Sequence, residues 1–210
     1  MSLIKNLKVK KDGFEIDIQE LEILDQGVHI IWGPSGGGKT TFLKALLGIE
    51  KSIGFSWIFN DTDLAKLSIA DRRLGVVFQT LDLFPHMTAY ENIVFAAQAR
   101  GIPKIEYTVK IHDWSAKLNM EYFLNRKAEY ISGGEAQRVA LVRALIGQPR
   151  MLLLDEPLSH LDKALRQEAR LILKNVISEI KIPVLMITHD EQDITDLAQK
   201  VSRFQNGKVT

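Results

Sequence analysis

The stretch GPSGGGKTT, residues 33–41, constrains the fold of this chain more than any other part of its sequence. It fits the pattern G-x-x-x-x-G-K-[ST], in which glycines let successive backbone N–H groups turn inward and form a nest for an anion. The short apolar run VHIIW (Val28–Trp32) precedes it, and a helical pattern follows. A helix that begins at such a loop adds the positive end of its dipole. The pattern predicts an α/β fold with a phosphate site between strand and helix, rather than a flexible turn.

The residues of this loop suit nucleotide phosphates. The loop contains Gly33, Pro34, Ser35, Gly36, Gly37 and Gly38 and continues into Lys39, Thr40 and Thr41. Lys39 can reach β- and γ-phosphates as a point charge, and Thr40 can give its hydroxyl to Mg²⁺. Thr41 can donate a hydrogen bond to an α-phosphate. We therefore expect a bound nucleotide with Mg²⁺.

Three further apolar runs predict buried parallel strands, because they are short and do not alternate with polar residues. They are GVVF before Gln79, MLLL before Asp155 and Glu156, and VLMI before Thr188 and His189. Ligand sites of open α/β sheets lie at the carboxyl ends of the strands. We expect these polar residues to lie near the phosphate loop.

Asp155 and Glu156 supply the carboxylates that the phosphate loop lacks. Proteins with this loop hold Mg²⁺ partly through an acidic residue at a strand end, and Asp155 fits that role. Glu156 can accept a proton from an attacking water. Two adjacent carboxylates repel each other, so a nearby cation makes physical sense. The alternative, a helix-capping Asp beside a surface Glu, is less favoured beside such a loop.

Helical patterns separate the strands. KTTFLKALLG ends at Gly48, a suitable C-cap, and the apolar stripe of DKALRQEARLILKNVISEIK begins after Asp162, a typical N-cap. Residues 81–147 carry helical patterns without a strong strand signal. We predict one domain, 1–210, in which 1–80 and 148–210 form the α/β core and 81–147 form an inserted α-helical subdomain.

Composition narrows the class of protein. The chain is 46% hydrophobic and 25% charged, which is typical of a soluble domain with a real core. Its 27 Lys and Arg residues nearly balance 26 Asp and Glu residues, which argues against a dedicated nucleic-acid binder. It has no cysteine, which excludes disulfides and thiolate metal sites. No apolar run approaches the ~20 residues that span a bilayer, and the charged N-terminus is not a signal peptide. We expect a cytoplasmic protein that reaches a membrane only through a partner.

Further motifs follow in a fixed order along the chain. They are GVVFQ, which contains Gln79, ISGGEAQRVALVRAL, which starts at Ile131, SHLD (Ser159–Asp162) and ITHD, which contains His189. Together with residues 33–41 they make nearly the whole chain resemble the ATP-binding subunits of ABC transporters. The resemblance implies a P-loop NTPase core of the RecA-like type with a mostly parallel sheet. It also implies an N-terminal antiparallel β subdomain and the inserted helical subdomain.

The resemblance implies a mechanism that spacing alone does not give. Two such subunits, identical or closely related, pair head to tail and enclose two ATP molecules. In each subunit Lys39, Thr40 and Asp155 would hold Mg–ATP. Gln79 would contact Mg²⁺ or a water and would sense the membrane partner. Glu156 would polarise the attacking water, and His189 would contact the γ-phosphate and orient that water.

The signature segment of the second subunit would close over the γ-phosphate. It consists of Ser132, Gly133, Gly134 and Glu135. Most members of the family have glutamine where this chain has Glu135. A carboxylate in that place would repel the γ-phosphate unless it is exposed or paired, so we expect turnover to depend on its environment.

Three more residues are assigned from the resemblance. Ser159 and Asp162 belong to the D-loop, and Asp162 would bridge the two subunits. Phe14 is the best candidate for the aromatic residue that stacks on adenine, although it lacks the hydroxyl of the usual tyrosine.

The segment LFPHMTAYENI (Leu83–Ile93) resembles importers of the maltose, molybdate, thiamine and polyamine kinds. Leu83, Phe84 and Tyr90 would line an apolar groove for a helix of the membrane permease, or they belong to the subdomain core. The chain stops at Thr210, so we expect it to lack the regulatory domain that many maltose- and molybdate-type members carry.

Other functions remain as alternatives. Exporters and lipoprotein-release ATPases share every catalytic motif with importers. Soluble ABC ATPases of DNA repair carry long coiled coils, for which this chain has no sustained heptads, and those of translation carry two cassettes in one chain. A small-molecule kinase with a P-loop would not need the Ser-Gly-Gly segment, Gln79 or SHLD.

Overall fold

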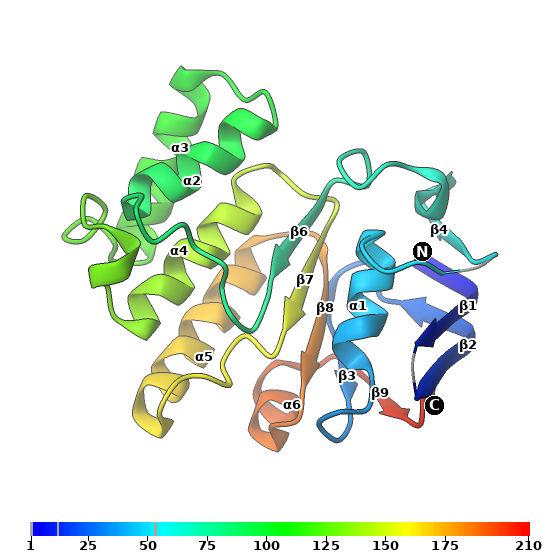
Figure 1. The fold of residues 1–210 in the computed structure, drawn as a ribbon. Coiled ribbons are helices and arrows are strands. Elements are labelled where there is room, and N and C mark those ends of the chain that lie inside the picture. Colours follow the sequence, from blue (N-terminus) through cyan, green and yellow to red (C-terminus); the bar gives the residue numbers. More distant parts are fainter. Residues whose placement is uncertain (1, 12, 53) are drawn as a thin grey trace.

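The computed structural model describes residues 2–11, 13–52 and 54–210, which form two β-sheets with helices between and beside them (Figure 1). The strands are β1 (Ser2–Lys11), β2 (Phe14–Ile23), β3 (Gly27–Trp32), β4 (Ser56–Phe59), β5 (Thr62–Asp63), β6 (Leu74–Val77), β7 (Met151–Asp155), β8 (Pro183–Thr188), β9 (Lys200–Gln205) and β10 (Lys208–Val209). The helices are α1 (Lys39–Leu47), α2 (Ala89–Ala99), α3 (Lys104–Lys117), α4 (Gly133–Leu145), α5 (Lys163–Glu179) and α6 (Glu191–Leu197), with 3-10 turns at Leu64–Lys66 and Ala128–Tyr130.

The larger sheet has the strand order β10-β9-β3-β8-β7-β6 and is parallel except where β10 pairs with β9. The four predicted strands are β3, β6, β7 and β8, and β7 extends far enough to include Asp155. The two central strands of this sheet, β3 and β8, are far apart in the sequence, since Val28 of β3 is paired with Val184 of β8. The predicted α/β class with a mostly parallel sheet is confirmed.

The smaller sheet has the order β2-β1-β4-β5 and is antiparallel throughout, as expected of the N-terminal part of the chain. Helix α1 packs between the two sheets, with Phe42 and Leu43 fully buried in a core that both sheets share. Gly38 before α1 and Gly48 after it are left-handed, with φ of 94° and 85°. The prediction that Gly48 ends this helix is confirmed, because its N–H donates to Ala45 O.

Helices α2, α3 and α4 lie between β6 and β7 in the chain and on the side of the parallel sheet away from β1 and β2 (Figure 1). They share a second core with the parallel sheet, in which Phe123 and Val139 are fully buried near Leu152. Helix α5 begins where predicted, since the Asp162 side chain accepts bonds from the N–H groups of two residues in its first turn. Among the described residues no helix is long and apolar enough to cross a membrane.

Candidate active site

The carboxyl edge of the parallel sheet gathers polar residues from distant parts of the chain. Lys39 follows β3 through the glycine loop, Gln79 follows β6, Glu156 follows β7 and His189 follows β8. Lys39, Gln79 and Glu156 line one cleft, which has a volume of about 350 Å³. These residues lie together because parallel strands place their carboxyl ends at the same edge.

Lys39 is almost fully buried, with 4% of its surface exposed. Its Nζ donates to the carbonyl oxygens of Gly33 and Pro34, both at 2.9 Å, and lies 3.8 Å from Glu156 Oε1. Burial lowers the pKa of Lys39, whereas the carboxylates of Glu156 and Asp155 act to raise it. The loop thus holds a cation at its centre, bonded to two carbonyl oxygens and paired with a carboxylate.

Close backbone contacts fix the glycine loop at both ends. A Cβ on Gly33 would lie 2.1 Å from the carbonyl oxygen of Phe204 in β9, so no larger residue fits there. At Gly38, whose φ is 94°, a Cβ would lie 2.7 Å from the ring of Phe14. The Phe14 ring therefore rests directly against the loop that precedes α1. Phe14 is the residue for which the resemblance implies stacking on adenine.

A second cleft, with a volume of about 450 Å³, is also lined by Phe14. Its walls combine the loop residues 34–37 with Glu15 and the turn Asn206–Gly207 between β9 and β10. The turn is held against β2, because Asp17 N donates to Gly207 O at 2.8 Å. The sequence reasoning missed this wall. The Asn-Gly pair between two short apolar runs signals the hairpin, but not which strand it packs on.

Asp155 and Thr40 form a pair of oxygen donors beside Lys39. Asp155 is 2% exposed, and its Oδ1 has no hydrogen-bond partner among the described residues. Burial raises the pKa of Asp155, a hydrogen bond from Thr40 lowers it, and the neighbouring Glu156 raises it. A buried carboxylate oxygen with free lone pairs next to a hydroxyl suits Mg²⁺, which binds through few protein ligands and keeps several waters. The residues present therefore fit this ion.

Glu156 stands in an unusual backbone conformation, with φ of 46°. Hydrogen bonds hold it there: Glu156 N donates to Ile187 O at 2.9 Å, and Ser159 Oγ donates to Glu156 O at 2.9 Å. A left-handed non-glycine residue costs about 1–2 kcal/mol, and such residues cluster at functional sites. The conformation directs the carboxylate toward two basic groups, since Oε1 faces Lys39 and Oε2 lies 3.0 Å from Nδ1 of His189.

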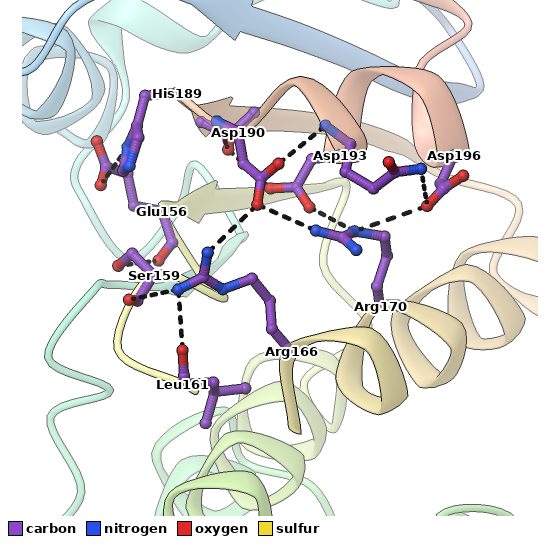
Figure 2. A network of polar contacts seen from close by, with 11 residues as sticks. Glu156, Ser159, Leu161, Arg166, Arg170, His189, Asp190, Asp193 and Asp196 are labelled. Carbon is purple, nitrogen blue, oxygen red and sulfur yellow. Dashed lines mark hydrogen bonds and ion pairs between the residues drawn. The ribbon is translucent and has the colours of Figure 1, made fainter. Parts of the chain in front are cut away.

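A network of arginines and aspartates supports the loop that carries His189 (Figure 2). Arg170 donates to Asp193 at 2.7 Å and to Asp190 at 3.1 Å, and Thr188 donates to Asp193 at 2.7 Å. His189 thus lies between two residues that this network holds. Arg166 extends the network toward the Ser159–Asp162 loop, because it donates to Leu161 O at 2.9 Å.

Sequence reasoning did not assign these arginines. Arg166 and Arg170 lie on one face of α5, and Asp190, Asp193 and Asp196 recur at intervals of three around α6. This charge pattern was a usable signal, because residues three and four apart share a helix face.

The signature segment begins α4 with a capping box. Ser132 Oγ accepts from Glu135 N at 3.3 Å, and Glu135 Oε2 accepts from Ser132 N at 2.7 Å. Burial acts to raise the pKa of Glu135, but hydrogen bonds from Ser132 and Tyr122 outweigh it, so the pKa lies below its usual value. The carboxylate of Glu135 is therefore paired with the N-terminus of its own helix. A paired carboxylate is one of the two cases in which we expected Glu135 not to repel the γ-phosphate.

The structure does not bring the signature segment to the phosphate loop of the same chain. Of the described residues that line the two clefts, none belongs to 132–135. The signature segment instead adjoins the Ser159–Asp162 loop, since a Cβ on Gly133 would lie 3.3 Å from the side chain of Leu161. Asp162 is committed to capping α5, and Ser159 binds the backbone of Glu156.

The three residues assigned to a docking groove separate in the structure. Leu83 and Tyr90 are partly buried and pack against the core around α2, α3 and α4. Phe84 lines a groove of about 590 Å³ together with Phe95, whose ring centroid lies 4.9 Å from its own. Phe78, which follows β6 directly, contributes to the same apolar wall.

Known proteins resemble this chain along its length. A family model described as "ABC transporter" matches residues 17–159. A probable sulfate/thiosulfate import ATP-binding protein CysA of Chlorella vulgaris is 35% identical over 99% of this chain and 88% of its own length. The glucose import ATP-binding protein GlcV of Saccharolobus solfataricus is 37% identical over 99% of this chain. The spermidine/putrescine import ATP-binding protein PotA of Clostridioides difficile is 36% identical over 94% of it.

The chain spans 61% and 56% of the lengths of the last two relatives. Among solved structures, a dimeric post-hydrolysis state of the ATP-binding cassette MJ0796 bound to ADP and Pi matches with a TM-score of 0.82 and 26% identity. The match covers 100% of this chain and 96% of that one.

Proposed function

This chain belongs to the ABC transporter family, and we propose that it is the ATP-hydrolysing subunit of a solute importer. One observation carries the proposal: Glu156 bridges Lys39 and His189 at the edge of the sheet where the glycine loop opens. A kinase has no need for the signature segment, and the relatives' names favour import over export.

ATP would bind across the two clefts that meet at Phe14. Lys39 and the N–H groups of residues 33–41 would bind the phosphates, and Phe14 would stack on the base. Thr40, Asp155 and Gln79 would hold Mg²⁺. Magnesium, when bound, would neutralise charge on the β- and γ-phosphates and orient them.

Glu156 would accept the proton of the attacking water. Its carboxylate is already oriented in the free chain by a left-handed backbone and by the Nδ1 contact with His189. His189, whose loop Arg170 holds, would keep that carboxylate in place and orient the water. Gln79, which lines the same cleft, would contact Mg²⁺ or a water and so couple nucleotide binding to the membrane partner in the groove that follows β6.

We propose that two copies of the chain, or this chain and a relative, complete each site. The capping box leaves the N-terminus of α4 preformed, with Ser132 at its tip, as an anion-binding end for the γ-phosphate of the second copy. Gly133 and Gly134 allow close approach, and a Cβ on Gly134 would meet nothing within 4 Å. Ser159 and Asp162 would lie at the interface.

A membrane permease would dock in the groove at Phe84 and Phe95, at the inner face of the cell membrane. The groove is apolar and lies where β6 leads into α2, so a helix of the permease would meet the segment that follows Gln79. Leu83 and Tyr90 would support it from the core. In this proposal 1–80 and 148–210 form the catalytic body, and 81–147 form the helical subdomain that carries both the groove wall and the signature segment.

The test is Mg²⁺-dependent release of phosphate from ATP by the purified chain. We expect hydrolysis without any added acceptor, and we expect Glu156→Gln to abolish it while ATP still binds. Transfer of phosphate to a small-molecule acceptor, with no release to water, would identify a kinase instead. Hydrolysis that survives in Glu156→Gln would remove the proposed catalytic base.

A further inference from the structure

A single arginine on α4 holds the loop that follows Gln79. Arg143 donates from Nη2 to the carbonyl oxygen of Leu81 at 2.6 Å and from Nη1 to that of Asp82 at 2.7 Å. These two residues are consecutive and both left-handed, with φ of 59° and 44°. Neither is a glycine, so the conformation is costly and needs support from outside the loop.

The loop is anchored by the Leu81 side chain, which is buried in the core, and by hydrogen bonds of its own. Leu81 N donates to Phe78 O at 2.9 Å, and Thr80 Oγ1 donates to Asp82 Oδ1 at 2.6 Å on the exposed surface. The two carbonyl oxygens that Arg143 contacts therefore depend on α4. A planar guanidinium can donate two bonds at once to neighbouring oxygens, which a lysine ammonium cannot match in geometry.

The segment that follows is fixed by a second polar residue. Asn92, which is fully buried in α2, accepts from Phe84 N at 2.8 Å and donates to Phe84 O at 3.1 Å. The chain from 81 to 84 is thus held by α4 at one end and by α2 at the other. Phe84 and Arg143 both line the groove described above.

The same helix ends at the signature segment. Arg143 stands near the C-terminus of α4, and Ser132 caps its N-terminus, roughly 16 Å away along a continuous helix. The C-terminal half of α4 is packed tightly on β6, since a Cβ on Gly75 would lie 2.6 Å from the carbonyl oxygen of Ala144. Because α4 is one continuous helix from Gly133 to Leu145, a tilt of its Arg143 end about this contact would also move Ser132.

We propose that Arg143 is a positioning residue that joins the loop at Gln79 to the helix that presents Ser132. An occupant of the groove that moves residues 79–84 then moves both parts of the ATP site together. This inference rests on the proposed function, because it assigns the link between the groove and the two halves of the site.

The test compares Arg143→Gln with Arg100→Gln in the full chain. Arg100 also donates to two backbone carbonyls, of Ala70 at 2.6 Å and Leu74 at 3.4 Å, but these lie before or within β6 and not in the loop. ATP turnover, Mg–ATP affinity and amide exchange of residues 81–84 are measured below the melting temperature of every variant. Arg143→Lys is the conservative variant, which keeps the charge and loses the paired geometry.

For Arg143→Gln we expect kcat to fall at least fivefold, the Mg–ATP dissociation constant to stay within twofold of wild type, and exchange at 81–84 to rise at least tenfold. For Arg143→Lys we expect values of kcat and of exchange at 81–84 between those of Arg143→Gln and wild type. Arg100→Gln should keep kcat within twofold of wild type. Faster exchange with an unchanged kcat would show that the bonds only stabilise the fold, and unchanged exchange would show that they do not hold the loop. Either result overturns the inference.

Two readouts separate this inference from the proposed function. If wild type does not hydrolyse ATP, the proposed function fails, and the inference is decided by ATP-dependent dimerisation in the Glu156→Gln background. Adding Arg143→Gln should weaken that dimer at least fivefold, whereas adding Arg100→Gln should not. If Arg143→Gln does not fold, Arg143→Lys takes its place in both comparisons. We then expect at least a twofold loss of kcat and at least a twofold weaker dimer.

Discussion

Glu156 and His189 face each other across 3.0 Å, from Oε2 to Nδ1, although they follow two different strands. The contact exists because β7 and β8 are parallel neighbours in the sheet, and Glu156 N is bonded to Ile187 O at the end of β8. The first carboxylate oxygen faces Lys39, so one side chain connects the phosphate loop to the histidine.

Glu156→Gln should keep nucleotide binding and lose most turnover, because glutamine is nearly isosteric and cannot take a proton. We expect kcat to fall by at least about 100-fold, the usual contribution of a general base. Light scattering should show a monomer that becomes a dimer with Mg–ATP. The matched control is Glu179→Gln, an exposed carboxylate paired with Lys117, which should leave turnover unchanged. A Glu156→Gln chain that binds ATP and stays monomeric would argue against a site shared by two copies in the isolated protein.

Lys39→Ala should abolish nucleotide binding, because it removes the buried cation at the centre of the glycine loop. The expected weakening is on the order of 100-fold or more, about 3 kcal/mol, as for other charged partners in buried sites. Lys44→Ala, on the same helix, should change affinity far less. Isothermal titration with Mg–ATP measures both, and an unchanged affinity in Lys39→Ala would reject the phosphate site.

Phe14→Ala should weaken ATP binding but not the binding of inorganic triphosphate, because its ring packs at the loop without supplying a charge. A stacked base contributes about 1–2 kcal/mol, so the ATP dissociation constant should rise roughly 5- to 30-fold. Phe14→Tyr should restore it. Equal losses for ATP and triphosphate would mean that Phe14 only supports the loop.

Glu135→Gln should lower stability at neutral pH. The folded-state pKa of Glu135 lies below its usual value of 4.5, so the charged carboxylate contributes stability above that value and loses it as pH falls through the lowered pKa. We expect a difference of about 1 kcal/mol near pH 7 that shrinks as the pH is lowered. Urea unfolding across this range measures it. Glu91→Gln, in the exposed capping box of α2, should act in the same direction and less strongly.

Arg170→Met should destabilise the fold strongly, because Asp193 is 2% exposed and would be left without its cation. Breaking a buried ion pair in this way costs about 3–5 kcal/mol. The double change Arg170→Met with Asp193→Asn should recover part of the loss. Lys117→Met breaks an exposed pair of similar length and should cost less than about 1 kcal/mol. Equal losses of stability in Arg170→Met and Lys117→Met would show that burial of the network in Figure 2 adds nothing to the cost of breaking its ion pair.

Local patterns were sufficient to predict the elements that carry the site. The four apolar runs became β3, β6, β7 and β8, and the caps at Gly48 and Asp162 lie where expected. Because the sheet is parallel, its topology alone placed Gln79 and Glu156 at one edge with Lys39. The roles assigned to these residues remain predictions.

The contacts that the sequence did not reveal are those between elements remote in the chain. Arg143 binds a loop some 60 residues earlier, at separations of 61 and 62. Phe204, which follows Gly33 by 171 residues in the sequence, lies against it from the neighbouring strand β9. Such contacts depend on packing, which propensity and spacing do not encode. Leu83 and Phe84 are a second example. They are adjacent on one loop, but Leu83 packs against the core and Phe84 lines the groove. The sequence pattern alone did not decide between core and docking groove for either residue.

The place of β3 in the larger sheet has a consequence for synthesis on the ribosome. This strand, which leads into the phosphate loop, pairs only with β8 and β9 among the described strands, and both are made near the end of the chain. Until they emerge, VHIIW is an apolar segment with both edges unpaired, the state in which nascent chains recruit chaperones or aggregate. Such long-range pairing forms slowly. Nucleotide binding at this loop must therefore wait until β8 and β9 have been made and have paired with β3.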